Sequence, residues 1–412
     1  MKKVFFILFF CGSFILKFQS FGQDWQIQQS TTTKMLNAIT FTDQNNGWAV
    51  GRDNLILHTS DGGMHWEKQP VPDDTIIDVD RHYFDSTLYD VCFISKDSGW
   101  AVGSKSLLQT IDGGKSWKHY KTAINSFLGG IFFINHRKGW VAGSEGKILF
   151  TQDGGTTWME QINSLGSLTT EWFSDIYFSD ELNGWAVGGF GNPSLFYTKD
   201  GGRNWYKGDV SGTNGEIISV YFANNKLGWV GTDDGKILCS KDGGNTWVTQ
   251  YNGSGWILDI SFTDNQTGWA IGQGGTILYT NNGGITWEIQ TSPVNVDLRG
   301  MFIGFGKMWI VGMDGTIISK NQPTGILNTS GEINSVNIYP NPVKDLLTLD
   351  FDNKELKEVK LINSLGQLVY YSSELTRNKI QIDTKNFPSG MYYISIQAKE
   401  GVLQKKVIVN HF

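Results

Sequence analysis

The chain has 412 residues, a formal charge of −6 and 3 cysteines. Its length suggests two or three domains. A mildly acidic chain argues against nucleic acid as the partner. So few cysteines exclude a disulfide framework, so stability must come from packing.

The first 22 residues read as a secretory signal peptide. Lys2 and Lys3 precede an apolar stretch, residues 4–16, that is too short to span a bilayer as a helix. Ser20-Phe21-Gly22 then offers small residues at −3 and −1, so we expect cleavage before Gln23. No later segment is long and apolar enough to span a membrane.

Cleavage removes three lysines and no acid, which lowers the formal charge to −9. Cys92 and Cys239 remain and fall in different repeats of the pattern described below. We therefore expect two buried free thiols.

A tryptophan motif similar to Gly-Trp-Ala-Val-Gly recurs at intervals of usually 40 to 45 residues, which is the period of a propeller blade. A phenylalanine stands seven residues before each of these tryptophans. The marker pairs are Phe41 and Trp48, Phe93 and Trp100, Phe133 and Trp140, Phe178 and Trp185, Phe222 and Trp229, Phe262 and Trp269, and Phe302 and Trp309. Seven markers predict seven blades.

Each unit reads as four short strands bounded by Gly, Asn and Asp. In the first unit these are "AITF", "GWAVG", "LILHTS" and "WEKQ". Such a unit cannot bury both of its faces alone, so the units pack radially. We therefore predict an all-β protein whose residues 23–320 form a seven-bladed β-propeller.

A second motif, Asp-Gly-Gly-x-x-Trp, joins the last two strands of six units. Its acidic or amide residues are Asp61, Asp112, Asp153, Asp200, Asp242 (followed by Gly243) and Asn282. The side-chain oxygen can accept backbone amides, the glycines supply positive φ, and the tryptophan packs between blades. Asn282 can still accept those bonds, whereas a catalytic carboxylate could not be exchanged for an amide. We interpret these boxes as structural turns rather than active sites.

The missing outer strand of the seventh blade lies near the start of the mature chain. "DWQIQQ" at 24–29 matches "TWEIQT" at 286–291 at Trp-x-Ile-Gln. We expect the N-terminal segment to supply this strand and to lock the ring.

The second motif is the Asp-box, or BNR, repeat. Paired with the Gly-Trp marker, it resembles the propeller family of photosystem II stability and assembly factors over about residues 24–320. The resemblance implies a non-enzymatic protein-binding scaffold without cofactor. Work on a photosystem does not transfer, because the predicted signal and the C-terminal domain give this chain another destination.

The pattern breaks after Lys320. Residues 321–333 are polar and turn-rich and read as a linker. Residues 334–412 alternate in short strands, which predicts a small immunoglobulin-like β-sandwich.

Three clusters in this tail resemble the type A sorting domain of the type IX secretion system: Tyr339-Pro340-Asn341-Pro342, Ser364-Leu365-Gly366-Gln367 and Pro388-Ser389-Gly390-Met391-Tyr392. The resemblance implies export through the periplasm of a Gram-negative bacterium to the medium or the outer surface. The secretion machinery is then one partner of the tail.

Two tryptophans are not required by the repeat. Trp172 and Trp256 each lie six residues before the marker phenylalanine of their blade, in the connection entering the central strand. Three residues before those phenylalanines the chain carries a column of mixed polarity: Ala38, Asp90, Gly130, Asp175, Ser219, Asp259 and Arg299. One reading is an aromatic and acidic ligand mouth; the other is that the acids bond to neighbouring backbone.

The longest insertion, residues 70–87, should lie on the same face. Asp78, Asp80 and His82 alternate there, but the glycine that sharpens hard-metal loops is missing, so a solvated loop is the simpler interpretation and no metal is predicted.

Two functions remain open. The first is a secreted or surface-displayed scaffold that binds a protein or glycan. The second is a glycan-active hydrolase with an acid pair from Asp90, Asp175 and Asp259, since Asp-box propellers include sialidases. The arginine cluster and the Arg-Ile-Pro motif of sialidases are absent from the sequence.

Overall fold

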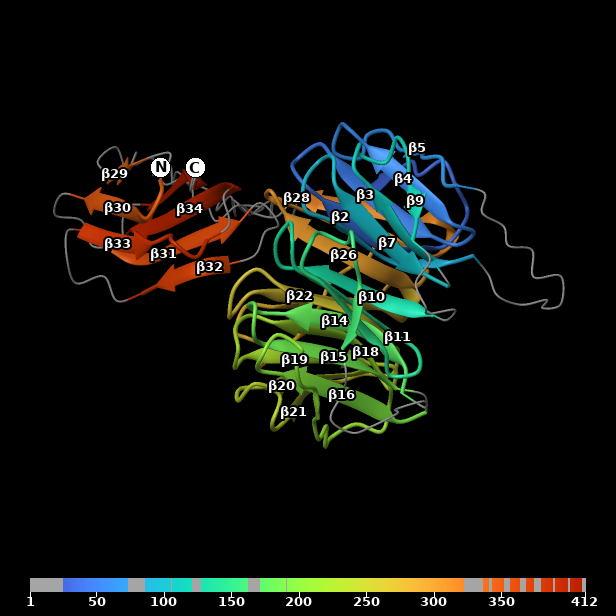
Figure 1. Ribbon diagram of the computed structural model, residues 1–412. Helices are drawn as coiled ribbons and strands as arrows, with labels where there is room; N and C mark the ends of the chain where they lie inside the picture. The colour runs from blue at the N-terminus through green and yellow to red at the C-terminus, as the bar shows by residue number, and fades with distance from the viewer. Residues whose placement is uncertain are drawn as a thin grey trace, which may run out of the picture.

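The computed structural model is almost entirely made of strands (Figure 1). It describes residues 25–72, 86–104, 106–120, 127–161, 171–189, 191–321, 336–340, 343–351, 356–363, 368–373, 379–387, 390–398 and 401–409. The predicted signal peptide, and the predicted linker apart from residue 321, lie outside these ranges.

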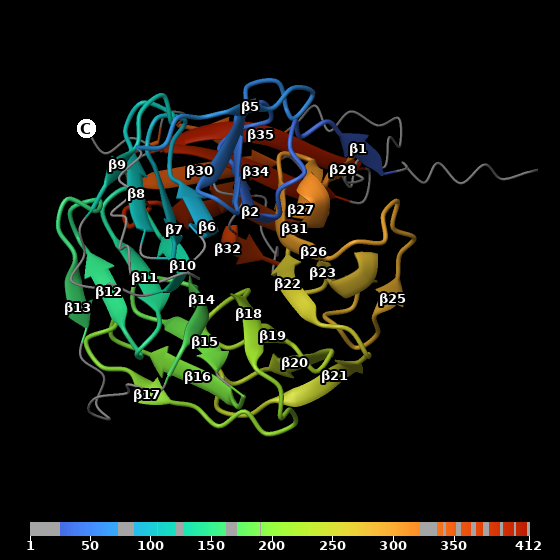
Figure 2. The same cartoon turned by 90° about the vertical axis from the view of Figure 1, so that its right-hand side faces the viewer.

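Residues 25–321 form seven four-stranded antiparallel sheets within the described ranges. Figure 2 shows them arranged around a common centre, and the innermost strand of the seventh sheet returns to that of the first. This is the predicted seven-bladed propeller. The strands of blades 1 to 3 are β2 (Leu36–Phe41), β3 (Gly47–Gly51), β4 (Leu55–Thr59), β5 (Glu67–Lys68), β6 (Leu88–Phe93), β7 (Gly99–Gly103), β8 (Ser106–Thr110), β9 (Lys118–His119), β10 (Leu128–Phe133), β11 (Gly139–Gly143), β12 (Ile148–Thr151) and β13 (Met159–Gln161).

Blades 4 to 6 repeat the same order, and blade 7 draws its outer strand from the start of the described chain. Their strands are β14 (Phe173–Phe178), β15 (Gly184–Gly189), β16 (Pro193–Thr198), β17 (Tyr206–Lys207), β18 (Ile217–Phe222), β19 (Gly228–Thr232), β20 (Lys236–Ser240), β21 (Val248–Asn252), β22 (Ile257–Phe262), β23 (Gly268–Gly272), β24 (Ile277–Thr280), β25 (Glu288–Ile289), β26 (Leu298–Gly304), β27 (Lys307–Gly312), β28 (Ile317–Asn321) and β1 (Gln26–Gln28).

The N-terminal strand closes the ring as the sequence predicts. Strand β1 pairs antiparallel with β28, and Ile27 lies opposite Ile318. In blade 6 the matching residue, Ile289, lies opposite Leu278 in the same register. The Trp-x-Ile-Gln match therefore reflects the fact that both segments form the outermost strand of their blade.

A sandwich of aromatic rings holds most of the seams between blades. Trp48 of blade 1 stacks on Phe93 of blade 2 with ring centroids 3.6 Å apart, and Trp117 from the box of blade 2 meets the same phenylalanine edge-on at 5.8 Å. The stack recurs in pairs Trp100 and Phe133, Trp140 and Phe178, Trp185 and Phe222, Trp229 and Phe262, and Trp309 and Phe41. Such pairs add about 0.5–1.5 kcal/mol each beyond the burial of their area.

The glycine before each marker tryptophan makes room for this stack. A Cβ built on Gly99 would lie 2.5 Å from the ring of Phe93, and the equivalent glycines of the other five blades are equally tight. Any larger residue there must displace the phenylalanine of its own blade.

Blade 7 departs from the predicted pattern for this reason. In blade 1, Phe41 lies opposite Gly47, whereas in blade 7 Phe302 lies opposite Trp309, one residue out of register. The position of the marker glycine is taken by Met308, which pairs with Ile303 and is fully buried beside Trp269. Phe302 is therefore not the structural equivalent of the other marker phenylalanines, and an aliphatic contact replaces the aromatic stack at the seam between blades 6 and 7.

The boxes form identical turns. In the first, Asp61 Oδ1 accepts the amide of His65 at 2.9 Å, and the Thr59 hydroxyl accepts the amide of Gly63 at 2.8 Å and donates to Asp61. The sixth copy keeps this geometry, with Asn282 Oδ1 accepting the amide of Thr286 at 3.0 Å. A hydroxyl two residues before the acid, which the predicted turn chemistry did not include, makes this bond in all six copies: Thr59, Thr110, Thr151, Thr198, Ser240 and Thr280.

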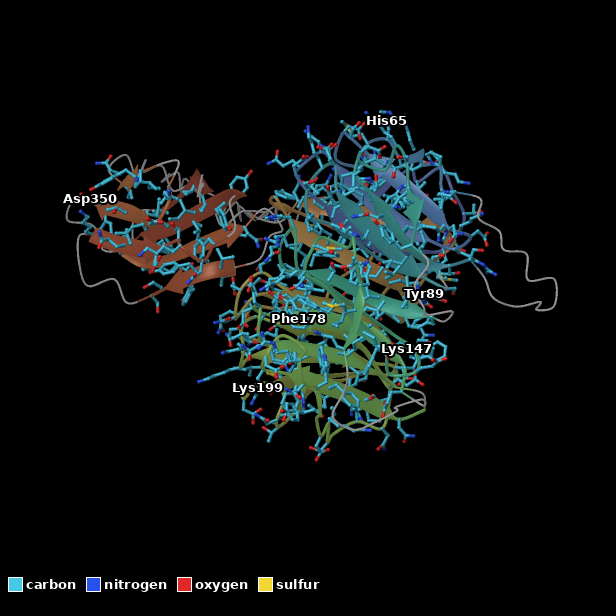
Figure 3. The ribbon with its side chains drawn as sticks, in the orientation of Figure 1. His65, Tyr89, Lys147, Phe178, Lys199 and Asp350 are labelled. Carbon is cyan, nitrogen blue, oxygen red and sulfur yellow. The ribbon has the colours of Figure 1, made fainter. Side chains whose placement is uncertain are left out.

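The two faces of the ring differ. Box turns bond to the turns between the first and second strands, as Gly62 N to Asn45 O at 2.9 Å shows, so both belong to one face, the box face. The opposite face carries the connections between blades and the loops between second and third strands, and we call it the loop face. Figure 3 places Tyr89 and Lys147, near the loop face, on the right and Lys199, beside a box, on the left.

The tail forms two facing sheets with one shared apolar core, which includes Leu349 and Ile394. The strands are β29 (Val336–Tyr339), β30 (Leu346–Phe351), β31 (Leu356–Asn363), β32 (Leu368–Ser372), β33 (Lys379–Asp383), β34 (Gly390–Ala398) and β35 (Gly401–Val409). The sheet orders are β29-β30-β33 and β32-β31-β34-β35. A β-sandwich is confirmed, while its immunoglobulin-like topology stays a prediction.

The sandwich lies on the box side of the ring in Figure 1. Lys360 Nζ of β31 lies 3.6 Å from the carboxylate of Asp264, in the turn after β22. The loop face points the other way.

Ring closure can be tested by removing residues 23–30. The seventh blade would lose the pairing of β1 and the packing of Trp25, so we expect the free energy of unfolding to fall by roughly 2 to 4 kcal/mol. Denaturant unfolding measures this. The control is Ile27→Ala, whose side chain is 60% exposed and should change little. An unchanged stability of the truncated protein would contradict closure by this strand.

Candidate functional site

A small cup opens in the central channel near the loop face. Each inner strand carries a register irregularity near its start, and two successive residues of most blades line the cavity, such as Tyr89 with Asp90. The upper ring consists of Asn37, Tyr89, Gly129, Ser174, Ile218, Leu258 and Arg299. The lower ring consists, by pairing register, of Ala38, Asp90, Gly130, Asp175, Ser219, Asp259 and Gly300. The cavity volume is about 140 Å³.

Arg299 belongs to the upper ring, which corrects its predicted place in the column of the acids. The one-residue shift of blade 7 puts Gly300, opposite Val311, where Asp259 lies opposite Ile271 in blade 6. The spacing of three residues before Phe302 predicts the wrong column because Phe302 is itself out of register.

The three aspartates each connect two blades. Asp90 Oδ2 accepts the amide of Ile131 at 2.8 Å, and Oδ1 accepts that of Val91 at 2.7 Å. Asp175 bonds in the same way to Val220 of blade 5, and Asp259 to Met301 of blade 7. Bonding to neighbouring backbone, one of the two readings of these acids, is therefore what the structure shows.

These carboxyls resist ionisation. Burial raises the pKa of Asp90 to about 7, that of Asp175 to about 6 and that of Asp259 to about 8. The charge of Asp175 further raises the pKa of the other two, while the backbone bonds oppose the shift. Near neutral pH the ring therefore holds protons on some of its acids.

Arg299 continues the chain of contacts around the ring. Its Nε–H donates to Asn37 Oδ1 at 2.7 Å, and Asn37 Nδ2 donates to Leu88 O at 2.8 Å, which connects blades 7, 1 and 2. Burial lowers the pKa of the guanidinium, while Asp297 and Tyr89 raise it.

Trp172 lies in an aromatic row on the loop face. Its ring centroid is 4.7 Å from that of Phe127, which is 4.6 Å from that of Tyr89 at the rim of the cup. The row spans blades 4, 3 and 2. Sequence reasoning missed Phe127 and Tyr89, since neither recurs in the repeat.

Trp256 stands apart on blade 6 with 47% of its surface exposed. Its carbonyl accepts the amide of Gln273 at 3.0 Å, and Gly189 N bonds to Trp172 O at 2.8 Å in the equivalent way. The repeat uses the backbone at this position and leaves the side chain free to vary. Neither indole lines the cup.

Residues 73–85 are outside the described ranges, so the acids and histidine predicted at 78–82 are not placed. Among described residues, no cluster of three His, Cys, Asp or Glu side chains could hold a metal, and no helix is long and apolar enough to cross a membrane. Cys92 is half-buried and Cys239 buried, and both are free.

The fold and the boxes define an Asp-box propeller that carries a C-terminal sandwich. A model described as photosynthesis system II assembly factor YCF48 matches overlapping segments from residue 19 to 333, so the chain belongs to that family. A model described as secretion system C-terminal sorting domain matches residues 337–410, which marks the chain for type IX export to the cell surface or the medium.

Individual relatives also match one part of the chain each. The photosystem II assembly lipoprotein Ycf48 of Synechococcus sp. (strain CC9902) is 26% identical over 259 residues, which cover 51% of this chain and 74% of that protein. The ulvan lyase NLR42 of Nonlabens ulvanivorans is 45% identical over 83 residues, covering 20% of this chain and 15% of the lyase. So short a match carries no enzymatic activity over.

Solved structures support the fold. YCF48 from Cyanidioschyzon merolae superposes with a TM-score of 0.59 and 23% identity over 72% of this chain and 98% of that one. PorZ, a surface component of the type IX secretion system of Porphyromonas gingivalis, gives 0.53 with 15% identity, over 90% of this chain and 59% of that one.

The acid ring predicts an unusual pH dependence of stability. A carboxyl whose folded pKa exceeds its unfolded value of 3.8 contributes stability that is lost as pH rises through the folded pKa. The box acids have lowered values, about 2 for Asp153 because of bonds from the Thr157 hydroxyl and amide, and stay ionised above pH 5. We therefore expect the melting temperature to fall between pH 5 and pH 8.

Calorimetric melts across this range test the prediction. The slope should flatten in Asp259→Asn, since that residue has the highest of the three pKa values. Asp209→Asn, at a residue outside the channel lining, is the control. A melting temperature that rises from pH 5 to pH 8 would contradict it.

Proposed function

We propose that this chain is a secreted or surface-displayed propeller of a Gram-negative bacterium that binds a protein or peptide with its loop face and catalyses no reaction. The predicted signal would carry it to the periplasm, and the sorting domain across the outer membrane. The observation that carries the binding role is the aromatic row of Tyr89, Phe127 and Trp172, because the repeat requires none of these rings.

Two further features support the loop face as the binding surface. The sandwich contacts the box side, at Asp264, and leaves the loop face pointing away from the sorting domain. A related propeller, YCF48, has been solved bound to a D1 peptide. Aromatic side chains are common anchors of binding energy in such surfaces.

A glycan hydrolase finds less support. Both oxygens of Asp90 already accept backbone amides, and Asp175 and Asp259 are engaged in the same way. The cup of about 140 Å³ is below the roughly 300–1,000 Å³ of typical small-molecule sites. Glycans therefore remain a ligand class to screen rather than a substrate class.

The binding role can be tested with three variants of the exported protein. Trp172→Ala and Trp256→Ala should weaken capture of the partner, found by crosslinking at the cell surface, by about tenfold or more, as anchors do. Their melting temperatures should change little. The control is Trp205→Ala in a box, fully buried, which should lose about 3 to 5 kcal/mol of stability.

Binding that is unchanged in both exposed-tryptophan variants would contradict the assignment of the loop face. Unfolding of either variant as readily as Trp205→Ala would show that the indoles serve the fold.

Export can be tested by deleting residues 334–412. The propeller has its own closed core and should fold, so the truncated protein should accumulate in the periplasm. Fractionation with an antibody to the propeller measures this. Appearance of the truncated protein in the medium at the normal level would refute the sorting role.

A further inference from the structure

The lower ring of the cup carries negative charge that the described residues do not neutralise. Asp90, Asp175 and Asp259 have no Lys, Arg or His nitrogen within 4.0 Å among the described side chains. Arg299 sits in the upper ring and is held against Asn37. The charges that act on its pKa are those of Asp297 and Tyr89 rather than those of the three acids. Each carboxylate oxygen that accepts one backbone amide keeps a second lone pair, which a cation entering the cup could use.

A polar group without a partner lies in the same ring. Ser219, between Asp175 of blade 4 and Asp259 of blade 6, is 3% exposed, lines the cup, and its hydroxyl has no hydrogen-bond partner. Leaving a buried hydroxyl unpaired costs free energy, so a ligand that hydrogen-bonds to it would recover that cost. This observation is independent of the charges and points to a polar ligand group, to which the hydroxyl can donate or from which it can accept a hydrogen bond.

The cup has the volume of a small alkyl group with a polar head. A cavity of about 150 Å³ holds a molecule the size of benzene, and this one measures about 140 Å³. Its wall includes apolar side chains, Ile218 and Leu258, above the acids. Beneath the acids, the rings of Phe132 and Tyr177 pack 5.0 Å apart, and Tyr177 and Tyr221 5.1 Å apart, so aromatic side chains occupy that level.

We propose that the cup binds a primary alkylammonium group, whose N–H donors reach Ser219 and the two aspartates on either side of it, Asp175 and Asp259, while its hydrocarbon stem lies against Ile218 and Leu258. Three donors on a compact cation match acceptors arranged in a ring. A bare metal ion fits less well, because no three of the described acids lie close enough to ligate one. The source is either a lysine side chain of a bound protein or a free amine.

This inference deepens the proposed function, because the cup opens toward the loop face and a lysine of the partner could enter it. The titratable groups around the acids are Tyr89 and Arg299 at the rim and Cys92 and Tyr177 toward the box face. Burial raises the pKa of Cys92 to about 12 and that of Tyr177 above its ordinary value, so neither group becomes charged between pH 5 and pH 8. A cation binds ionised acids, so its affinity should rise with pH in this window.

The test is calorimetric titration of the full mature protein with n-butylammonium chloride, with n-butanol as the neutral control. We expect binding of the amine alone, about tenfold or more tighter at pH 8 than at pH 5, with protons released on binding. No binding of the amine at pH 8, or equal affinity at both pH values, would overturn the proposal.

The site is located by a variant that fills the cup. Ser174→Leu places a larger side chain in the upper ring, which fills part of the cup, and should abolish binding without unfolding. Asp175→Asn should weaken it at least tenfold, and Glu160→Gln, an exposed acid on β13, should not change it. Binding that survives Ser174→Leu would place the amine elsewhere and overturn the proposal.

Two further titrations separate the sources. A lysine-containing peptide that binds more tightly than its acetyl-lysine form, and more tightly than butylammonium, indicates a protein lysine; equal affinity with butylammonium indicates a free amine. Amine binding without any loop-face partner would leave this inference standing while the proposed function fails, and a partner captured without amine binding would do the reverse.

Discussion

The stacking of a tryptophan of one blade on a phenylalanine of the next is the contact on which the rest of the ring depends. At the seam of blades 4 and 5 the rings of Trp185 and Phe222 lie 3.5 Å apart and 4° from parallel. So close a stack fixes the spacing of neighbouring inner strands, and it requires a glycine beside each phenylalanine, where any Cβ would overlap the ring. The glycine, the two aromatics and the box tryptophan are therefore one unit of sequence, and their joint recurrence has a physical cause.

This dependence explains both the success and the failure of sequence reasoning. The number of blades and the closing strand follow from recurring residues, and the structure confirms both. The boxes form the hydrogen-bonded turns that their residues predict. The error came in blade 7, where Met308 stands in place of glycine. With a phenylalanine in register, the methionine would overlap it, so Ile303 takes that position and Phe302 moves one residue along. Phe302 still stands seven residues before Trp309, but it no longer occupies the structural position of the other marker phenylalanines. Counting from it therefore predicts Arg299 in the lower ring, whereas Arg299 lies in the upper ring.

The cup could be predicted only in part. Its acids were found because they share a column with fixed spacing, but their bonds to the next blade depend on the register irregularity at the start of each inner strand, which has no mark in the sequence. Gln69 behaves differently: its amide donates to Gly113 O at 2.8 Å and accepts from Trp117 at 3.2 Å, bridging two blades. Gln28 and Gln161, which also stand three residues after a tryptophan, make the same contacts with the next box, so this bridge belongs to the repeat.

The ring separates stability from recognition. The repeated groups lie between blades or on the box face. They are the boxes, the marker glycines and the stacked rings, and a substitution in any of them disturbs the contact between two blades. The residues that do not repeat gather on the loop face and in the cup, where strand pairing needs only the backbone, as the bonds from Gly189 and Gln273 to the carbonyls before the inner strands show. Side chains there can change without loss of the ring, so selection for a ligand can act on them. The acids of the cup are the exception, because their carboxylates both hydrogen-bond to the next blade and place charge in the channel. Binding of a ligand to these carboxylates is therefore coupled to the stability of the whole propeller.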